Sequence, residues 1–272
     1  MLTVVLGLAA LALVGYVVVC GVLYHYQRAL LYHPVPAAAS ATSRVFNVDG
    51  QRLRVSVSDA AGAAAVLYFG GNAEDVSHAL PALQQAFPAR ALYLMHYRGY
   101  GGSSGTPTQD ALQADGLALF DWVQRRHPRV LVVGRSLGTG IAVRIAALRP
   151  VQKLVLVTPY DSIENVAAAL FPFAPVSLLL QDKYQSVLLA PRVRAPTLVI
   201  VAERDEVIPR ARTDALVQAF GHGVAEVRVL LGATHNVALQ RPDCLAFMRA
   251  ASSSSAARPT TPTHAPAESS ER

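Results

Sequence analysis

The sequence predicts an α/β protein with a mostly parallel central sheet and helices on both faces. Short, nearly continuous apolar runs alternate along the chain with longer segments of helical periodicity. Strands that are apolar throughout are buried on both faces, which is typical of a parallel sheet between two helical layers. The chain has 272 residues, of which 52% are apolar and 15% charged. This composition excludes an intrinsically disordered protein and is sufficient for one sizeable core.

The first 23 residues contain no charged side chain, and 19 of them are apolar. A helix rises about 1.5 Å per residue, so roughly 20 residues cross a hydrocarbon core of about 30 Å. We therefore predict a transmembrane anchor over 1–23, followed by the interfacial residues Tyr24, Tyr26 and Arg28. A cleaved signal peptide is the main alternative, but no Lys or Arg precedes the run, and no small residue stands directly before Cys20.

The basic residues around this helix predict its orientation. Arg28, Arg44, Arg52 and Arg54 follow the helix, whereas only the amino terminus precedes it. The positive-inside rule then places the following domain on the cytoplasmic side of a single-pass membrane protein. Arg44 and the later arginines can equally belong to a folded domain, which leaves the opposite orientation open.

After the anchor, the elements follow in a regular order. Asp49-Gly50 between short alternating runs predicts a β-hairpin. Strands are expected over 64–69, 91–95, 130–133, 153–157, 197–202 and 227–231, and helices over 75–85, 108–126, 137–148, 210–220 and 239–248. Residues 250–272 are rich in Ser, Thr and Pro without apolar periodicity, which predicts a disordered tail. One domain over 24–249 remains.

Functional groups in such folds gather at the carboxyl ends of the strands. The sequence Gly134-Arg135-Ser136-Leu137-Gly138 follows one predicted strand and precedes a predicted helix. A G-x-S-x-G sequence in this context indicates a sharp turn that exposes a nucleophilic serine. A Gly/Ser-rich turn that binds phosphate is the alternative. We predict that Ser136 is a nucleophile.

A neutral serine needs a base and an acid that orients the base. Where such a turn carries the serine, the chain order is serine, acid, histidine. His235 follows the last strand and fits the base, and Asp205 follows the penultimate strand and fits the acid. Asp161, one strand earlier, is the rival acid, whereas Glu203 and Glu206 are neighbours that can be surface charges.

An oxyanion needs two N–H donors near the serine. Gly70-Gly71-Asn72-Ala73 follows the strand over 64–69, so the Asn72 N–H and the Leu137 N–H are the expected donors. An ordinary glycine turn is the alternative. No metal or organic cofactor is expected for this chemistry. The net charge of +6 comes from dispersed arginines, so we expect no nucleic-acid partner.

Taken together, these residues resemble the α/β-hydrolase superfamily, and most of all its membrane-anchored, single-pass branch of serine-aminopeptidase-like hydrolases, which includes protein depalmitoylases. The resemblance covers about residues 24–248. It rests on Gln27-Arg28-Ala29-Leu30-Leu31-Tyr32-His33-Pro34, Gly71-Asn72-Ala73, Tyr97-Arg98-Gly99-Tyr100-Gly101, Gly134-Arg135-Ser136-Leu137-Gly138, Asp182-Lys183-Tyr184 with Ser186, Asp205 with Pro209, and Gly232 with His235-Asn236.

The chain departs from that branch at two positions. The branch usually has His where Gly70 stands, which affects the shape of the oxyanion loop, and Asp where His96 stands, which affects the pocket rim. The resemblance implies an α/β-hydrolase fold in which the segment 162–191, strongly apolar over 167–180, forms a small cap. A plain buried helix is the alternative. An apolar cap wall would suit an acyl chain.

The expected function is a membrane-anchored serine hydrolase that cleaves carboxylic esters or thioesters through an acyl-enzyme on Ser136. Its expected substrates are small-molecule or lipid acyl compounds or an acylated protein. Two alternatives remain open. One is a serine peptidase with the same three residues, and the other is a non-catalytic, membrane-tethered interaction protein, because a fold alone does not establish activity.

Overall fold

The computed structural model describes residues 1–37, 43–60 and 62–253. Its sheet has eight strands in the order β1-β2-β4-β3-β5-β6-β7-β8. β1 pairs antiparallel with β2, β2 pairs antiparallel with β4, and the remaining pairs are parallel. This confirms the predicted mostly parallel sheet. The strands are β1 (Ser43–Val48), β2 (Gln51–Ser58), β3 (Ala64–Phe69), β4 (Ala91–Met95), β5 (Arg129–Arg135), β6 (Lys153–Val157), β7 (Thr197–Arg204) and β8 (Ala225–Thr234).

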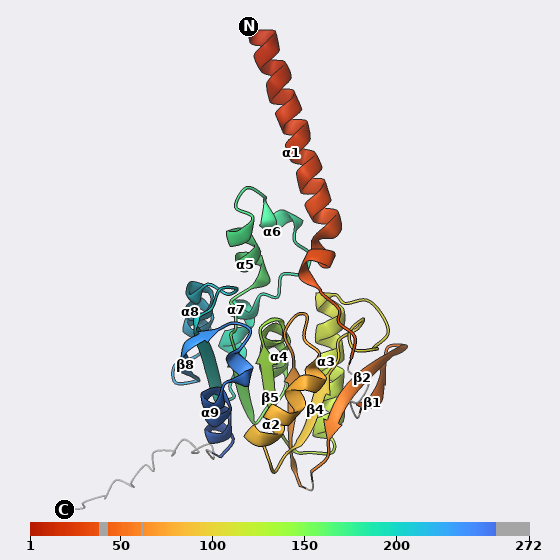
Figure 1. Ribbon diagram of the computed structural model, residues 1–272, viewed down its shortest axis with the longest axis vertical. Coiled ribbons are helices and arrows are strands. Elements are labelled where there is room, and N and C mark those ends of the chain that lie inside the picture. Colours follow the sequence, from red (N-terminus) through yellow and green to blue (C-terminus); the bar gives the residue numbers. More distant parts are fainter. Residues whose placement is uncertain (38–42, 61, 254–272) are drawn as a thin grey trace, which may run out of the picture.

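The helices connect these strands and precede and follow them (Figure 1). The α-helices are α1 (Leu2–Leu31), α2 (Leu80–Ala86), α3 (Gln109–Gln124), α4 (Leu137–Leu148), α5 (Ile163–Leu170), α6 (Val176–Leu179), α7 (Ser186–Leu189), α8 (Arg210–Ala219) and α9 (Pro242–Ser253). The described residues also form the short 3-10 helices η1 (Val76–Ala79), η2 (Ala190–Arg192) and η3 (Ala238–Gln240). The predicted hairpin turn is present, with Asp49 and Gly50 at φ 45° and 71°.

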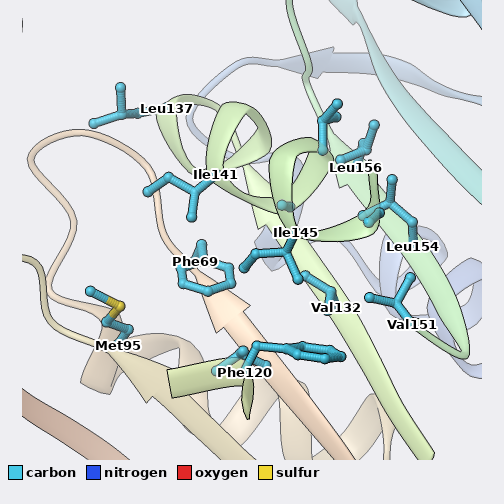
Figure 2. Close-up of a cluster of buried hydrophobic side chains, with 14 of the residues drawn as sticks. Phe69, Met95, Phe120, Val132, Leu137, Ile141, Ile145, Val151, Leu154 and Leu156 are labelled. Atoms are coloured by element: carbon cyan, nitrogen blue, oxygen red, sulfur yellow. The ribbon is translucent and has the colours of Figure 1, made fainter. Parts of the chain in front are cut away.

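Each face of the sheet carries its own hydrophobic core. Successive residues of β3 alternate between them: Leu67 and Phe69 pack toward α3 and α4, whereas Val66 and Tyr68 pack toward α2 and α9. Figure 2 shows the first of these cores, in which Phe69 lies close to Ile141 of α4. Because both faces are buried, nearly every residue of the central strands is apolar.

Prolines explain where two predicted helices differ from the observed ones. The helix predicted over 75–85 is divided into η1 and α2, and α2 has Pro81 in its first turn. The helix predicted over 239–248 is divided into η3 and α9, which begins at Pro242. Proline favours the first turn of a helix, where its missing N–H is not needed. α9 continues to Ser253, beyond the predicted boundary at 249, and the rest of the predicted tail lies outside the described residues.

α1 and the cap lie at the same end of the molecule (Figure 1). α1 continues to Leu31, eight residues beyond the predicted anchor over 1–23, and none of its residues is buried. The segment predicted as a cap forms α5, α6 and α7 instead of one buried helix. In α5 and α6 only Val166 and Val176 are buried. The segment therefore takes the position of a cap.

Candidate active site

Ser136 lies in the turn between β5 and α4, at the carboxyl edge of the sheet. Its φ of 47° and ψ of −118° are unusual for a residue with a side chain, and such a backbone costs on the order of 1–3 kcal/mol. The turn also requires glycines. A Cβ on Gly134 would lie 2.7 Å from the Gly138 carbonyl oxygen, and a Cβ on Gly138 would collide with the Phe69 carbonyl oxygen.

Three residues predicted from the sequence meet at this turn. The His235 Nε2 lies 2.8 Å from the Ser136 Oγ, and the His235 Nδ1 lies 2.9 Å from each carboxylate oxygen of Asp205. The backbone N–H groups of Val207 and Ile208 donate to the Asp205 Oδ1 at 3.0 and 2.7 Å. With Nδ1 donating to Asp205, Nε2 is the acceptor for the Ser136 hydroxyl. This arrangement can move a proton from serine to histidine.

The rival acid and the two neighbouring glutamates have other partners. Asp161 accepts hydrogen bonds from the Ser162 N–H and the Asn165 amide and pairs with Arg212 at 3.2 Å. Glu206 accepts from the His235 N–H at 3.0 Å, and Glu203 accepts from the Gly232 N–H at 2.7 Å. The two glutamates therefore hold the backbone of the histidine loop, a role that the sequence reading missed.

The loop after β3 places Asn72 beside Ser136 and Leu137 at one cavity. The Asn72 amide donates to the Leu31 carbonyl oxygen at 2.6 Å, and its oxygen accepts from the His33 N–H and the Tyr100 hydroxyl. The side chain thus fastens the loop to the end of α1. Among the described residues, neither the Asn72 N–H nor the Leu137 N–H has a backbone acceptor, which leaves both groups able to bind an oxyanion.

A buried ion pair beneath the serine was not predicted. Glu74 accepts from Arg135, from the Gly71 N–H and from the Tyr68 hydroxyl, each at 2.6 Å. Arg135 also donates to the Asn236 carbonyl oxygen at 3.2 Å. Burial alone would lower the pKa of the Arg135 guanidinium. The adjacent Glu74 acts in the opposite direction, through its negative charge and its hydrogen bond, and on balance the pKa of Arg135 is raised. The pair joins the oxyanion loop, the serine turn and the histidine loop. The only sequence signals were an arginine beside Ser136 and a glutamate after Asn72.

His96, one of the two departures from the resembled branch, does not line the cavity. It is buried, and its Nε2 lies 2.8 Å from the Ser56 hydroxyl. Burial lowers the pKa of its imidazole, so it is neutral at pH 7. A Cβ on Gly101 would collide with the His96 ring. His96 therefore supports the glycine-rich loop over 97–105 and does not itself form part of the cavity wall.

A cavity of about 280 Å³ opens at Ser136. Asn72, Ser136, Leu137 and Tyr160 line it at the catalytic end, and the other walls come from the last turns of α1, from the cap, and from the residues after β7. The side chains are almost entirely apolar. Those on α1 are Leu23, Gln27, Leu30 and Leu31, and those of the cap are Ile163, Val166, Ala167, Leu170, Phe171, Ala174, Val176, Leu179 and Leu180.

Several known proteins resemble this chain, two of those named here over more than two thirds of its length, although no family model matches it. An uncharacterised protein of Mycobacterium tuberculosis is 34% identical over 231 residues, which cover 79% of this chain and 82% of that protein. The α/β-hydrolase domain-containing protein WAV2 of Arabidopsis thaliana is 24% identical over 72% of this chain and 76% of its own. The lysophosphatidylserine lipase ABHD12 of Danio rerio is 29% identical over 42% of this chain and 35% of its own.

Solved structures share the fold at low sequence identity. Est1E of Butyrivibrio proteoclasticus with bound ferulic acid superposes with a TM-score of 0.67 at 15% identity, over 77% of this chain and 97% of that one. The esterase Pf2001 of Pyrococcus furiosus superposes with a TM-score of 0.63 at 15% identity, over 81% of this chain and 94% of that one.

Proposed function

Because this chain belongs to the α/β-hydrolase superfamily and has its fold, we propose that it is a membrane-anchored serine hydrolase that cleaves carboxylic esters or thioesters. One observation carries this proposal. Asp205, His235 and Ser136 form a continuous hydrogen-bonded line that ends in an apolar cavity. Neither a phosphate-binding turn nor a purely structural serine needs this line.

The catalytic residues act in two half-reactions. The Ser136 Oγ attacks the carbonyl carbon while the His235 Nε2 takes its proton, and the Asn72 and Leu137 N–H groups bind the oxyanion. The bond to the alcohol or thiol then breaks, and His235 returns the proton to the leaving group. Water next attacks the acyl-enzyme with His235 as base, which releases the acid and restores Ser136. Asp205 stabilises the imidazolium in both steps.

The cavity supports a lipid or acyl substrate. Its walls are apolar, so the acyl part of the substrate gains free energy by leaving water there. The lipase name of the Danio rerio relative agrees with this class. Either a lipid or an acylated protein can present such a chain at a membrane. α1 is long and apolar enough to cross that membrane.

We place the hydrolase domain on the cytoplasmic side. The strands β1 and β2 of the folded domain contain Arg44, Arg52 and Arg54. Of the basic residues that follow the apolar run, Arg28 is therefore the one on which the orientation given by the positive-inside rule depends. Protease accessibility in intact cells tests this placement, because an outward-facing domain would be degraded.

The catalytic proposal is tested with a fluorophosphonate probe on the full-length protein in detergent. We expect labelling of the wild type and none of Ser136→Ala. Asp205→Asn should lower ester turnover by about 10³-fold to 10⁴-fold, because the imidazole loses its orienting acid. Asp161→Asn is the matched control and should keep turnover within about tenfold, since Asp161 contacts neither His235 nor Ser136.

Esters of increasing chain length, an acyl-thioester and a peptide amide separate the substrate classes. We expect turnover of the esters and thioester to increase with chain length until the cavity is filled. A folded wild type that resists the probe and cleaves none of these compounds would contradict the enzyme proposal. Cleavage of the peptide alone would favour a peptidase.

A further inference from the structure

The cap is fastened to α1 at two levels. Near the folded domain, the Gln27 amide donates to the Leu179 carbonyl oxygen at 3.1 Å, and Arg28 pairs with Asp182 at 3.0 Å. Much farther along the helix, the Tyr16 hydroxyl donates to the Phe173 carbonyl oxygen at 3.1 Å. The loop between α5 and α6 thus lies beside the middle of α1.

This contact places the tip of the cap at a definite depth. The apolar run at the start of α1 ends at Leu23, and Tyr16 precedes Leu23 by seven residues, or about 10 Å of helix. If α1 spans a bilayer, Tyr16 lies inside the hydrocarbon core, which is about 30 Å thick. Phe173, whose carbonyl oxygen accepts a hydrogen bond from the Tyr16 hydroxyl, then lies inside the hydrocarbon core as well.

The composition of the cap tip fits that environment. Residues 166–180 contain no charged side chain, and Leu170, Phe173 and Leu178 are 67%, 56% and 82% exposed. Charged side chains are found at the base of the cap, where Asp182 pairs with Arg28 and Lys183 pairs with Glu164. Such a distribution is expected of a segment whose tip meets lipid tails and whose base meets headgroups.

The backbone of the tip is also suited to a medium without water, in which an unpaired N–H is costly. Pro172 and Pro175 have no N–H, and the N–H groups of Phe171, Ala174 and Val176 donate to nearby carbonyl oxygens. The carbonyl of Phe173 accepts from Tyr16. Among the described residues, the N–H groups of Phe173 and Ser177 have no backbone acceptor, so most but not all of the backbone donors of the tip are paired.

The cavity at Ser136 lies between these two elements. Leu23, Gln27 and Leu30 of α1 form one wall, and Leu170, Phe171 and Leu179 of the cap form the opposite wall. We propose that the cap tip is embedded in the bilayer and that the substrate is a lipid of the same leaflet, whose acyl chain passes between α1 and the cap to Ser136 without entering water. This rests on the proposed hydrolase function.

The depth of the cap is tested by tryptophan fluorescence. The chain has one tryptophan, Trp122, and Phe173→Trp adds a second at the cap tip. In vesicles of acyl-brominated phosphatidylcholine, we expect Phe173→Trp to be quenched at least twofold more than Val45→Trp. Val45 is the matched control because it is 60% exposed and lies on β1, at the far edge of the sheet. Equal quenching of the two variants would overturn the embedding.

The route of the substrate is tested with full-length protein in vesicles. Neither Phe173 nor Leu178 lines the cavity, so the double variant Phe173→Asp, Leu178→Asp replaces no side chain of the cavity wall. We expect it to hydrolyse a long-chain lysophospholipid in the bilayer at least tenfold more slowly than the wild type, and soluble p-nitrophenyl acetate at the same rate within twofold. Val45→Asp should affect neither rate.

The two proposals fail in different ways. If the wild type cleaves neither substrate, the hydrolase function is wrong. If it cleaves both and the double variant cleaves the lysophospholipid as fast as the wild type, hydrolysis stands and entry from the leaflet is wrong. A loss of both rates in the double variant would place Phe173 and Leu178 in the catalytic machinery and also overturn the proposed route.

Discussion

At the scale of single residues, the ion pair of Glu74 and Arg135 holds the loops that surround the serine and the histidine. Each side chain is only 11% exposed, and between them they contact the Gly71 N–H and the Asn236 carbonyl oxygen. These two backbone groups belong to the oxyanion loop and to the histidine loop. Glu74 is therefore a positioning residue, which acts through the groups that it holds.

Glu74→Gln should separate positioning from stability. The amide keeps the shape of the side chain but leaves the Arg135 charge without its counter-ion, and breaking such a buried pair costs about 3–5 kcal/mol of folding free energy. We also expect kcat for a soluble ester to fall about tenfold in the folded protein, because the oxyanion loop loses its fixed position. Thermal unfolding and kcat are measured on the same samples.

Glu226→Gln provides the comparison for this variant. Glu226 pairs with Arg228, but both side chains are more than half exposed, so the change should cost less than about 1 kcal/mol and leave kcat intact. If Glu74→Gln lowers the unfolding temperature but not kcat, the ion pair is structural only.

At the scale of elements, the sequence was sufficient where one physical signal dominated. The six strands predicted for the parallel region are all present. Burial on both faces makes β3 to β7 almost entirely apolar, whereas β8 lies at the edge of the sheet and is mostly exposed. The turn at Ser136 was predictable because its backbone demands Gly134 and Gly138. The Glu74–Arg135 ion pair could not be predicted, because its two residues are 61 positions apart in the sequence. A single charged residue also adds nothing to the apolar periodicity from which elements are predicted.

The packing of α4 against β3 leads to a prediction about this turn. Gly138→Ala would drive a Cβ into the Phe69 carbonyl oxygen, and backbone atoms in a sheet cannot move aside as a side chain can. We expect a loss of about 3 kcal/mol, which lowers the unfolding temperature by roughly 6–12 °C. Gly221→Ala is the control, since its Cβ would meet only Val224, at 3.5 Å. An equal shift in the two variants would contradict the proposed tight approach.

At the scale of the whole molecule, α1 is both the predicted membrane anchor and a wall of the cavity, and the sequence predicted only the first. Its apolar run predicted an anchor, and composition gave no sign that the helix continues to Leu31 and lines the cavity. The less exposed residues Cys20, Leu23, Gln27 and Leu31 follow a helical spacing on one side of α1. That side faces the cap, so the shape of the cavity at Ser136 depends on a tertiary contact and not on a local pattern.

Removal of residues 1–23 tests how far the anchor and the folded domain are independent. No residue of α1 is buried, and both cores are built from residues after Gln27, so the truncated protein should unfold within a few degrees of the full chain. The proposed embedding of the cap, however, predicts that its exposed apolar side chains still bind lipid. We expect the truncated protein to co-sediment reversibly with phosphatidylcholine vesicles. The further change Phe173→Asp with Leu178→Asp should release it, whereas Val45→Asp should not. A truncated protein that stays in the supernatant would mean that α1 alone holds the domain at the membrane.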